Sequence, residues 1–230
     1  GMAMLWKSDL WPYKTEPEVF HKRIHAIYQA AKRITRKNGS LEEAFPYEGS
    51  FCVTALVAFD LLSALELLEE NIDTANRERW QSAIEPMIQF LIRSDETHGI
   101  ISNHLATAVA ALSRWHLITG DRRAETKAEF LLNRILSNQS QEGWFREYEG
   151  ADPGYQSLCT YYLADVHLKR PDWNLLPPLR RSLQFLWHFA HPDGSFGGIY
   201  GSRCTRFYNP AGVLALASEI PEARVLSQYM

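Results

Sequence analysis

The sequence lacks the features by which several classes of protein are recognised. Its 230 residues include only three cysteines, Cys52, Cys159 and Cys204, which have neither the paired spacing of a zinc site nor the even number of a disulfide framework. No apolar run approaches the roughly 20 residues that a membrane helix needs. The N-terminal segment lacks the apolar core of a signal peptide. The sequence therefore predicts reduced, buried cysteines, a cytoplasmic location and no association with membranes.

An excess of charge of one sign is also missing. The 24 Lys and Arg residues nearly balance the 27 Asp and Glu residues, so the formal net charge is -3. Such a chain has no general electrostatic attraction for nucleic acid, and any anion site has to be local. With 46% hydrophobic and 22% charged residues, the composition is that of an ordinary globular protein.

Four segments repeat one apolar pattern, with hydrophobic residues at positions i, i+4, i+7, i+8 and i+11. This spacing puts the hydrophobic residues on one face of a helix. The opposite faces are charged, so each of these helices is expected to have one side in solvent. The repeated positions are Phe20, Ile24, Ile27, Tyr28 and Ala31; Trp80, Ile84, Met87, Ile88 and Leu91; Ala124, Ala128, Leu131, Leu132 and Ile135; and Leu179, Leu183, Leu186, Trp187 and Ala190.

Helices of a second kind are expected to alternate with these four. They are apolar over most of their circumference and rich in alanine, which is typical of helices surrounded by other helices. Their segments are 51–68, 104–118, 155–168 and 211–218.

A helix-start signal precedes each apolar helix, either a capping side chain or a capping side chain followed by proline. The signals are Ser50, Ser102, Asp152-Pro153 and Asn209-Pro210, and successive signals are 52, 50 and 57 residues apart. A period of about 50 residues, each unit being one amphipathic and one apolar helix, is typical of a helical-hairpin array. We therefore expect an all-α fold, an incomplete α/α toroid of about four hairpins in two concentric layers. It would form a single domain over residues 1–230, with an N-terminal arm at 1–14.

Parallel inner helices would place their N-termini at one end of such a ring, so residues at the helix starts would become neighbours. Free helix N–H groups favour anions such as carboxylates, and aromatic rings beside hydrogen-bonding groups suit sugars. The predicted site residues are Tyr47 and Glu48 from the first repeat; Asn103 and His104 from the second; Trp144, Glu147, Tyr148, Asp152 and Tyr155 from the third; and Tyr200, Arg203, Arg206 and Tyr208 from the fourth.

Several of these residues have an ordinary structural alternative. Asn103 and His104 could simply complete a helix terminus, and Asp152 could be a cap. Arg203 and Arg206 could bond only to loop carbonyls.

Four segments resemble the helical toroid domain of heparinase II/III-like polysaccharide lyases, and they are closest to its uncharacterised members. The segments are EAFPYEGSFC, the Asn103-His104 pair, EGWFREYEGADPGYQSL and GGIYGSRCTRFYNPAG, within roughly residues 40–216. The resemblance implies that Asn103 and His104 help to bind a uronate carboxylate. It also implies that Tyr155, with Tyr148 as the alternative, takes part in proton transfer.

The reaction implied by this resemblance is β-elimination from an acidic, uronate-containing oligo- or polysaccharide, with no metal or organic cofactor. Neutralising the carboxylate, with Arg203 contributing, makes the neighbouring proton easier to remove. The family's usual pattern has a second asparagine and a glycine where this sequence has Ser102 and Leu105. Family lyases usually carry a β-sandwich domain after the toroid. We therefore expect the open end of the array to be covered by a second copy of the chain or by such a domain.

Three functional interpretations remain open: a lyase or lyase-like enzyme, a non-catalytic saccharide-binding or scaffold module, and another toroid enzyme. The last class includes a hydrolase of unsaturated uronides with Asp152 or Glu147 as the general acid. A triterpene cyclase fits less well, because its aspartate-rich metal motif is missing. His21 and His25, four residues apart on the first amphipathic helix, are a conceivable zinc pair without an evident third ligand.

Overall fold

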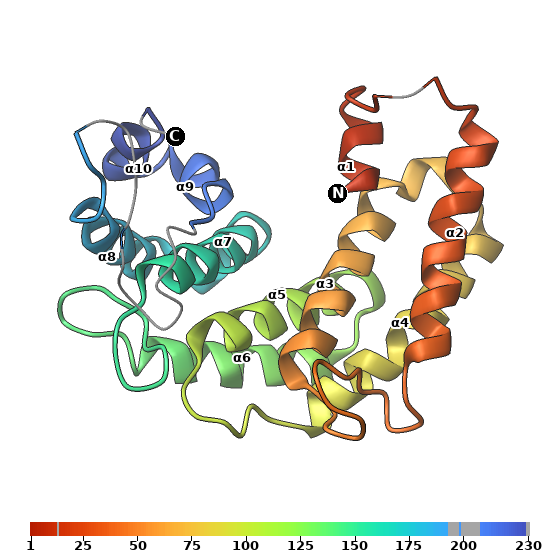
Figure 1. Ribbon diagram of the computed structural model, residues 1–230, viewed down its shortest axis with the longest axis horizontal. Helices are drawn as coiled ribbons and strands as arrows, with labels where there is room; N and C mark the ends of the chain where they lie inside the picture. Colours follow the sequence, from red (N-terminus) through yellow and green to blue (C-terminus); the bar gives the residue numbers. More distant parts are fainter. Residues whose placement is uncertain (13, 193–197, 199–207, 229–230) are drawn as a thin grey trace. The chain divides into compact units, whose positions relative to one another are not determined.

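The computed structural model describes the whole chain except residues 13, 193–197, 199–207 and 229–230 (Figure 1). The described residues form helices joined by loops, and among them β-pairing is limited to isolated bridges. The α-helices are α1 (Met2–Lys7), α2 (Pro17–Ile34), α3 (Phe51–Leu67), α4 (Thr74–Arg93), α5 (Ser102–Thr119), α6 (Arg122–Leu136), α7 (Pro153–Lys169), α8 (Leu176–Trp187), α9 (Ala211–Leu216) and α10 (Pro221–Leu226). Two short 3-10 helices lie at Glu69–Asn71 and Pro171–Trp173.

The predicted alternation of amphipathic and apolar helices is confirmed. α2, α4, α6 and α8 are the amphipathic helices, and α3, α5, α7 and α9 are the apolar ones. The all-α class and the helical-hairpin order expected of an α/α toroid therefore hold.

The described chain divides into two compact units, which are considered separately. Unit 1 comprises residues 1–95 and 114–124, and unit 2 comprises residues 96–113 and 125–230, so the division falls within α5. The expected single domain over 1–230 stays a prediction. The expected N-terminal arm contains α1, whose Trp6 ring stacks on Phe20 of α2 with ring centroids 4.2 Å apart.

Unit 1 packs α2 and α4 through their predicted apolar faces (Figure 1). Tyr28 of α2 stacks on Trp80 of α4 with ring centroids 4.3 Å apart. Its hydroxyl donates to the carbonyl oxygen of Leu61 in α3 at 2.6 Å, so one buried side chain links three helices. Ile27 is the exception to the predicted face, because it is 42% exposed.

Unit 2 joins α7 and α8 through a buried polar side chain. Gln156 of α7 accepts the N–H of Phe145 at 2.7 Å and donates to the hydroxyl of Ser182 in α8 at 2.6 Å. Satisfied buried amides of this kind restrict neighbouring segments to one arrangement. Trp187, which was predicted on the buried face of α8, is 40% exposed at the end of that helix.

The predicted caps of α3 and α7 are confirmed, whereas those of α5 and α9 are wrong. Ser50 accepts the N–H of Val53 at 3.1 Å, and Asp152 caps α7 with Pro153 as its first residue. Asn209 accepts the N–H of Ala211 at 3.1 Å, but α9 begins at Ala211 with Pro210 in the cap position, so Pro210 is not its first residue. Ser102 is not a cap: it is the first residue of α5, and its hydroxyl donates to the carbonyl oxygen of Arg146 at 2.7 Å.

A repeated glycine contact connects each of two loops to the next amphipathic helix. Gly39, with φ +91°, lies so close to α4 that a Cβ would be 2.0 Å from the carbonyl oxygen of Pro86. Gly143, with φ +101°, lies equally close to α8, where a Cβ would be 2.1 Å from the carbonyl oxygen of Arg181. Only glycine fits both the backbone conformation and the space.

Cys52 and Cys159 are free, as predicted, although Cys52 is half-buried and only Cys159 is fully buried. Cys204 lies outside the described residues. None of the helices in the described part of the chain is long and apolar enough to span a membrane.

Candidate functional site

The beginning of α5 presents a single side chain to solvent. Every residue from Ile101 to Trp115 is buried except His104, whose side chain is 21% exposed. The burial follows from the sequence, because α5 is apolar and rich in alanine on nearly all sides. His104 is therefore the residue through which this stretch of α5 meets solvent or a ligand.

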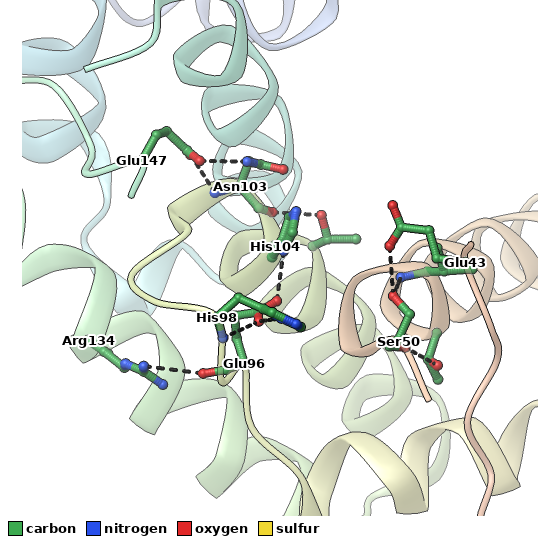
Figure 2. Close-up of polar contacts among 11 residues, drawn as sticks. Glu43, Ser50, Glu96, His98, Asn103, His104, Arg134 and Glu147 are labelled. Atoms are coloured by element: carbon green, nitrogen blue, oxygen red, sulfur yellow. Dashed lines mark hydrogen bonds and ion pairs between the residues drawn. The ribbon is translucent and has the colours of Figure 1, made fainter. Parts of the chain in front are cut away.

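The imidazole of His104 contacts a buried carboxylate through Nδ1 (Figure 2). Glu96, in the segment between α4 and α5, has a side chain that is only 2% exposed, and its Oε2 lies 2.7 Å from Nδ1 of His104. Its Oε1 lies 2.8 Å from Nδ1 of His98 and accepts the backbone N–H of His98 at 3.0 Å. Arg134 of α6 donates to the carbonyl oxygen of Glu96 at 3.5 Å. These residues all belong to unit 2.

The two histidines keep Glu96 ionised despite its burial. Burial by itself raises the pKa of Glu96, but hydrogen bonds from His104 and His98 outweigh it and lower that pKa from 4.5 to about 2. Because an ionised carboxylate only accepts hydrogen bonds, Nδ1 of His104 carries the shared proton. In the neutral imidazole Nε2 then has a free lone pair, and no described residue forms a hydrogen bond with it.

A second buried glutamate, Glu147, binds the residue before His104. Oε1 of Glu147 accepts the backbone N–H of Asn103 at 2.8 Å, and Oε2 accepts its side-chain amide at 2.7 Å. Asn103 is only 4% exposed and Glu147 only 5%. The N–H groups at the start of a buried helix need an acceptor inside the protein. The amide donor that was expected to meet a substrate carboxylate is therefore directed to Glu147.

The loop that carries Glu147 runs alongside the start of α5. Both the N–H and the hydroxyl of Ser102 donate to the carbonyl oxygen of Arg146, at 3.0 and 2.7 Å. The N–H of Tyr148 donates to the carbonyl oxygen of Ile100 at 2.9 Å. Residues 146–148 are thus fixed beside residues 100–102.

Glu147 lies between the starts of α5 and α7. Burial, reinforced by the negative charge of Asp152 and partly offset by hydrogen bonds from Asn103, raises the pKa of Glu147 from 4.5 to about 8. Asp152 caps α7, since its Oδ1 accepts the N–H of Tyr155 at 3.0 Å. The structure therefore brings together Asn103, Glu147 and Asp152 of the predicted site.

The start of α9 lies beside the first turns of α7. The N–H of Asn209 donates to the hydroxyl of Ser157 in α7 at 2.7 Å. The neighbouring Tyr208 is half-buried, and burial raises its pKa to about 12. Arg203 and Arg206, together with Tyr200, lie outside the described residues.

The remaining predicted residues differ in exposure. Tyr155 is half-buried in the first turn of α7, and Tyr148 is 46% exposed. Trp144 is half-buried, and its indole N–H donates to Glu142 at 3.0 Å. Tyr47 and Glu48 belong to unit 1.

Sequence reasoning missed Glu96 and His98. The polar run Asp95–Gly99 precedes α5 directly, but it has the composition of an ordinary loop. Glu96 and His104 are eight residues apart, but Glu96 lies in the segment before α5, so helical spacing does not relate the two residues. Their contact depends on how the loop folds back onto α5, and no pattern in the sequence indicates this.

His21 and His25, the conceivable zinc pair, have no third ligand among the residues that the structure describes. Nδ1 of His25 accepts the indole N–H of Trp80 at 3.1 Å, so one ring nitrogen of the pair is already used. In the part of the chain that the structure describes, no group of three or more His, Cys, Asp or Glu residues is placed to hold a metal ion.

A family model and two solved structures are similar to this chain. The family model described as the ulvan lyase N-terminal domain matches residues 13–208. Among curated proteins none matches the sequence. The family match supports the expected helical polysaccharide-lyase domain, but it does not single out the heparinase II/III group.

Two solved structures have a similar fold. The first is an inactive variant of the alpha-1,6-mannanase GH76A of Salegentibacter sp. HEL1_6 in complex with alpha-1,6-mannotriose, with a TM-score of 0.60 and 13% identity over 90% of this chain. This chain spans 64% of the length of that mannanase chain. The second is a polysaccharide lyase, with a TM-score of 0.59 and 10% identity over 99% of this chain and 75% of the other. Both are α/α toroids, so the predicted fold class is confirmed.

Proposed function

This chain belongs to the ulvan lyase N-terminal domain family, and we propose that it acts on an acidic, uronate-containing polysaccharide by β-elimination, with His104 as a proton-transferring residue. One observation carries the proposal: His104 is the single partly exposed side chain on a buried helix start, and the buried carboxylate of Glu96 lies 2.7 Å behind it. A polysaccharide lyase and a mannanase of similar fold add support for a saccharide ligand.

Elimination needs a base for the proton next to the uronate carboxylate and an acid for the glycosidic oxygen that leaves. With Nδ1–H of His104 held by Glu96, the lone pair of Nε2 is directed away from the carboxylate and can take that proton. The imidazolium then forms 2.7 Å from the Glu96 carboxylate, which compensates the new positive charge. Glu96 is thus a positioning residue, because it acts through His104.

Tyr155 is the proposed acid for the leaving oxygen. It is half-buried in the first turn of α7, whose cap Asp152 interacts electrostatically with Glu147. Glu147 in turn binds the start of α5 through Asn103, so this contact connects the two helix starts. We assign Asn103 a positioning role, and Arg203 remains the proposed partner of the substrate carboxylate.

A non-catalytic saccharide-binding module is the second candidate function. It is favoured by the contacts of Asn103, because the group expected to neutralise the substrate carboxylate donates to Glu147 instead. The uronide hydrolase has less support. Its proposed acids, Asp152 and Glu147, are 7% and 5% exposed and already act as a helix cap and as an acceptor for Asn103.

The test is elimination of ulvan, followed by the ultraviolet absorbance of the conjugated double bond that the reaction creates. His104→Ala and Tyr155→Phe are each expected to lower kcat by roughly 10²- to 10⁴-fold. The matched control is His98→Ala, which removes an imidazole that binds the same carboxylate but is 79% exposed. An activity of His104→Ala within twofold of the wild type would contradict the proposal. Binding of ulvan without any product would favour the second candidate.

A further inference from the structure

A loop of unit 1 carries two exposed aromatic rings on either side of a proline. Phe45 is 71% exposed and Tyr47 is 82% exposed. Pro46 between them is also exposed. Single exposed apolar residues are ordinary on protein surfaces, but here three ring-bearing residues in succession form one larger apolar surface.

The backbone of this loop adopts a turn that is unfavourable for one of the rings. The N–H of Glu48 donates to the carbonyl oxygen of Phe45 at 3.4 Å, with Pro46 and Tyr47 at the centre of the turn. The φ of Tyr47 is +71°, in the left-handed region that favours glycine. Proline followed by a residue with positive φ is the arrangement of a type II turn, in which glycine is the usual choice at the second position. The large ring of Tyr47 is therefore kept at a position where its backbone is strained.

Glu42 and Arg36 hold Tyr47 in place. Oε1 of Glu42 accepts the N–H of Tyr47 at 2.7 Å and also pairs with Arg36. The guanidinium carbon of Arg36 lies 4.6 Å from the centre of the Tyr47 ring, so one face of the ring is covered by a cation. The high exposure of Tyr47 shows that the rest of the ring remains open.

Two further glutamates fix the other side of the loop. Oε1 of Glu48 accepts the backbone N–H groups of Glu43 and Ala44, the latter at 2.6 Å. The hydroxyl of Ser50 donates to Oε2 of Glu43 at 3.0 Å (Figure 2). The loop is thus cross-linked by its own carboxylates, and the two aromatic rings project from an ordered backbone.

We propose that Phe45 and Tyr47 form a binding surface on which a pyranose ring of the polysaccharide stacks, an inference that rests on the proposed function. The C–H faces of sugars pack against aromatic rings, while their hydroxyl groups stay hydrogen-bonded to water or protein. A loop that is already ordered loses little conformational entropy when it binds, so its contacts contribute more fully to affinity. This explains why aromatic rings are exposed here and why a strained tyrosine occupies the place of a glycine.

The experiment measures the Kd of the full chain for ulvan oligosaccharides by calorimetry, with alpha-1,6-mannan oligosaccharides as a neutral comparison. Phe45→Ala and Tyr47→Gly are each expected to weaken binding about five- to tenfold. Tyr47→Gly also removes the backbone strain, so its Tm should not fall below that of the wild type. The matched control is Phe130→Ala in α6, since Phe130 is 53% exposed with the amino group of Lys127 5.1 Å from its ring centre. This control should bind like the wild type.

The outcomes separate this inference from the proposed function. If Phe45→Ala and Tyr47→Gly bind as tightly as the wild type while His104→Ala loses elimination activity, the binding surface is refuted and the lyase function stands. If both variants lose affinity but the wild type eliminates nothing, the surface stands and the lyase function is refuted. A Tyr47→Gly variant that melts at a lower temperature would identify the ring as a packing element and overturn the inference. Failure of the wild type to bind either saccharide would refute both.

Discussion

The substitution Glu96→Gln tests the arrangement around His104 directly. It removes the buried negative charge and keeps nearly the same shape. The two histidine contacts lower the pKa of Glu96 from 4.5 to about 2, which corresponds to about 3 kcal/mol of stability at neutral pH. A glutamine retains part of the hydrogen bonding. We therefore expect a loss of about 2 kcal/mol and a Tm lower by roughly 4–8 °C.

The stabilisation by Glu96 should depend on pH in a defined direction. A carboxyl group whose pKa is lowered by folding stabilises the native state above its unfolded pKa of 4.5, and this contribution is lost as the pH falls towards about 2. Glu96→Gln lacks this dependence on pH. The difference in Tm between the wild type and Glu96→Gln should therefore become smaller as the pH falls from 4.5 to about 2. Thermal unfolding followed by circular dichroism at a series of pH values measures it.

The same substitution should affect catalysis more than folding. A glutamine amide can donate to Nδ1 of His104, which moves the imidazole proton to Nε2 and removes the lone pair that acts as base. We expect kcat to fall roughly 10²- to 10⁴-fold with little change in KM. Nitrogen NMR of the histidines should find Nδ1 protonated in the neutral wild type and Nε2 protonated in Glu96→Gln. His98→Gln is the control and should retain the wild-type tautomer of His104.

Two results would refute this reasoning. One is a wild-type His104 whose neutral form carries its proton on Nε2. The other is a Glu96→Gln variant with the Tm and kcat of the wild type.

Three further predictions follow from other contacts. Because burial raises the pKa of Glu147 from 4.5 to about 8, the free energy of unfolding should be highest below pH 4.5 and should fall, by up to about 5 kcal/mol, as the pH rises through about 8. Urea unfolding should show this fall in the wild type and not in Glu147→Gln. Gly143→Ala should destabilise strongly, since its Cβ would lie 2.1 Å from the carbonyl oxygen of Arg181, whereas Gly150→Ala, with nothing within 4 Å, should stay within about 0.5 kcal/mol of the wild type in the same assay. Asp152→Ala should cost about 1 kcal/mol by loss of the α7 cap and Asp152→Asn much less; equal losses would rule out capping as the cause.

The sequence predicted the helices well because their signals are local. The amphipathic faces of α4 and α6 are buried as the spacing indicated, and Ser50 and Asp152 cap the helices that follow them. The wrong predictions concern residues whose surroundings are set by segments distant in the sequence. Ile27 has the right spacing, but none of the described segments covers it, and it is 42% exposed. The hydroxyl of Ser102 finds the carbonyl oxygen of Arg146, which only folding brings near, and donates to it instead of capping α5.

The all-α class and the repeat of about 50 residues could be predicted from the sequence alone, and so could the position of Asn103 and His104 at the start of an apolar helix. Helical periodicity and capping depend on residues within one or two turns of each other, so they can be read from the chain. The contact of Asn103 with the buried Glu147 and the contact of His104 with Glu96 are seen only in the folded chain. Contacts between residues 8 and 44 positions apart depend on how loops return to a helix end, and loop paths carry no periodic signal.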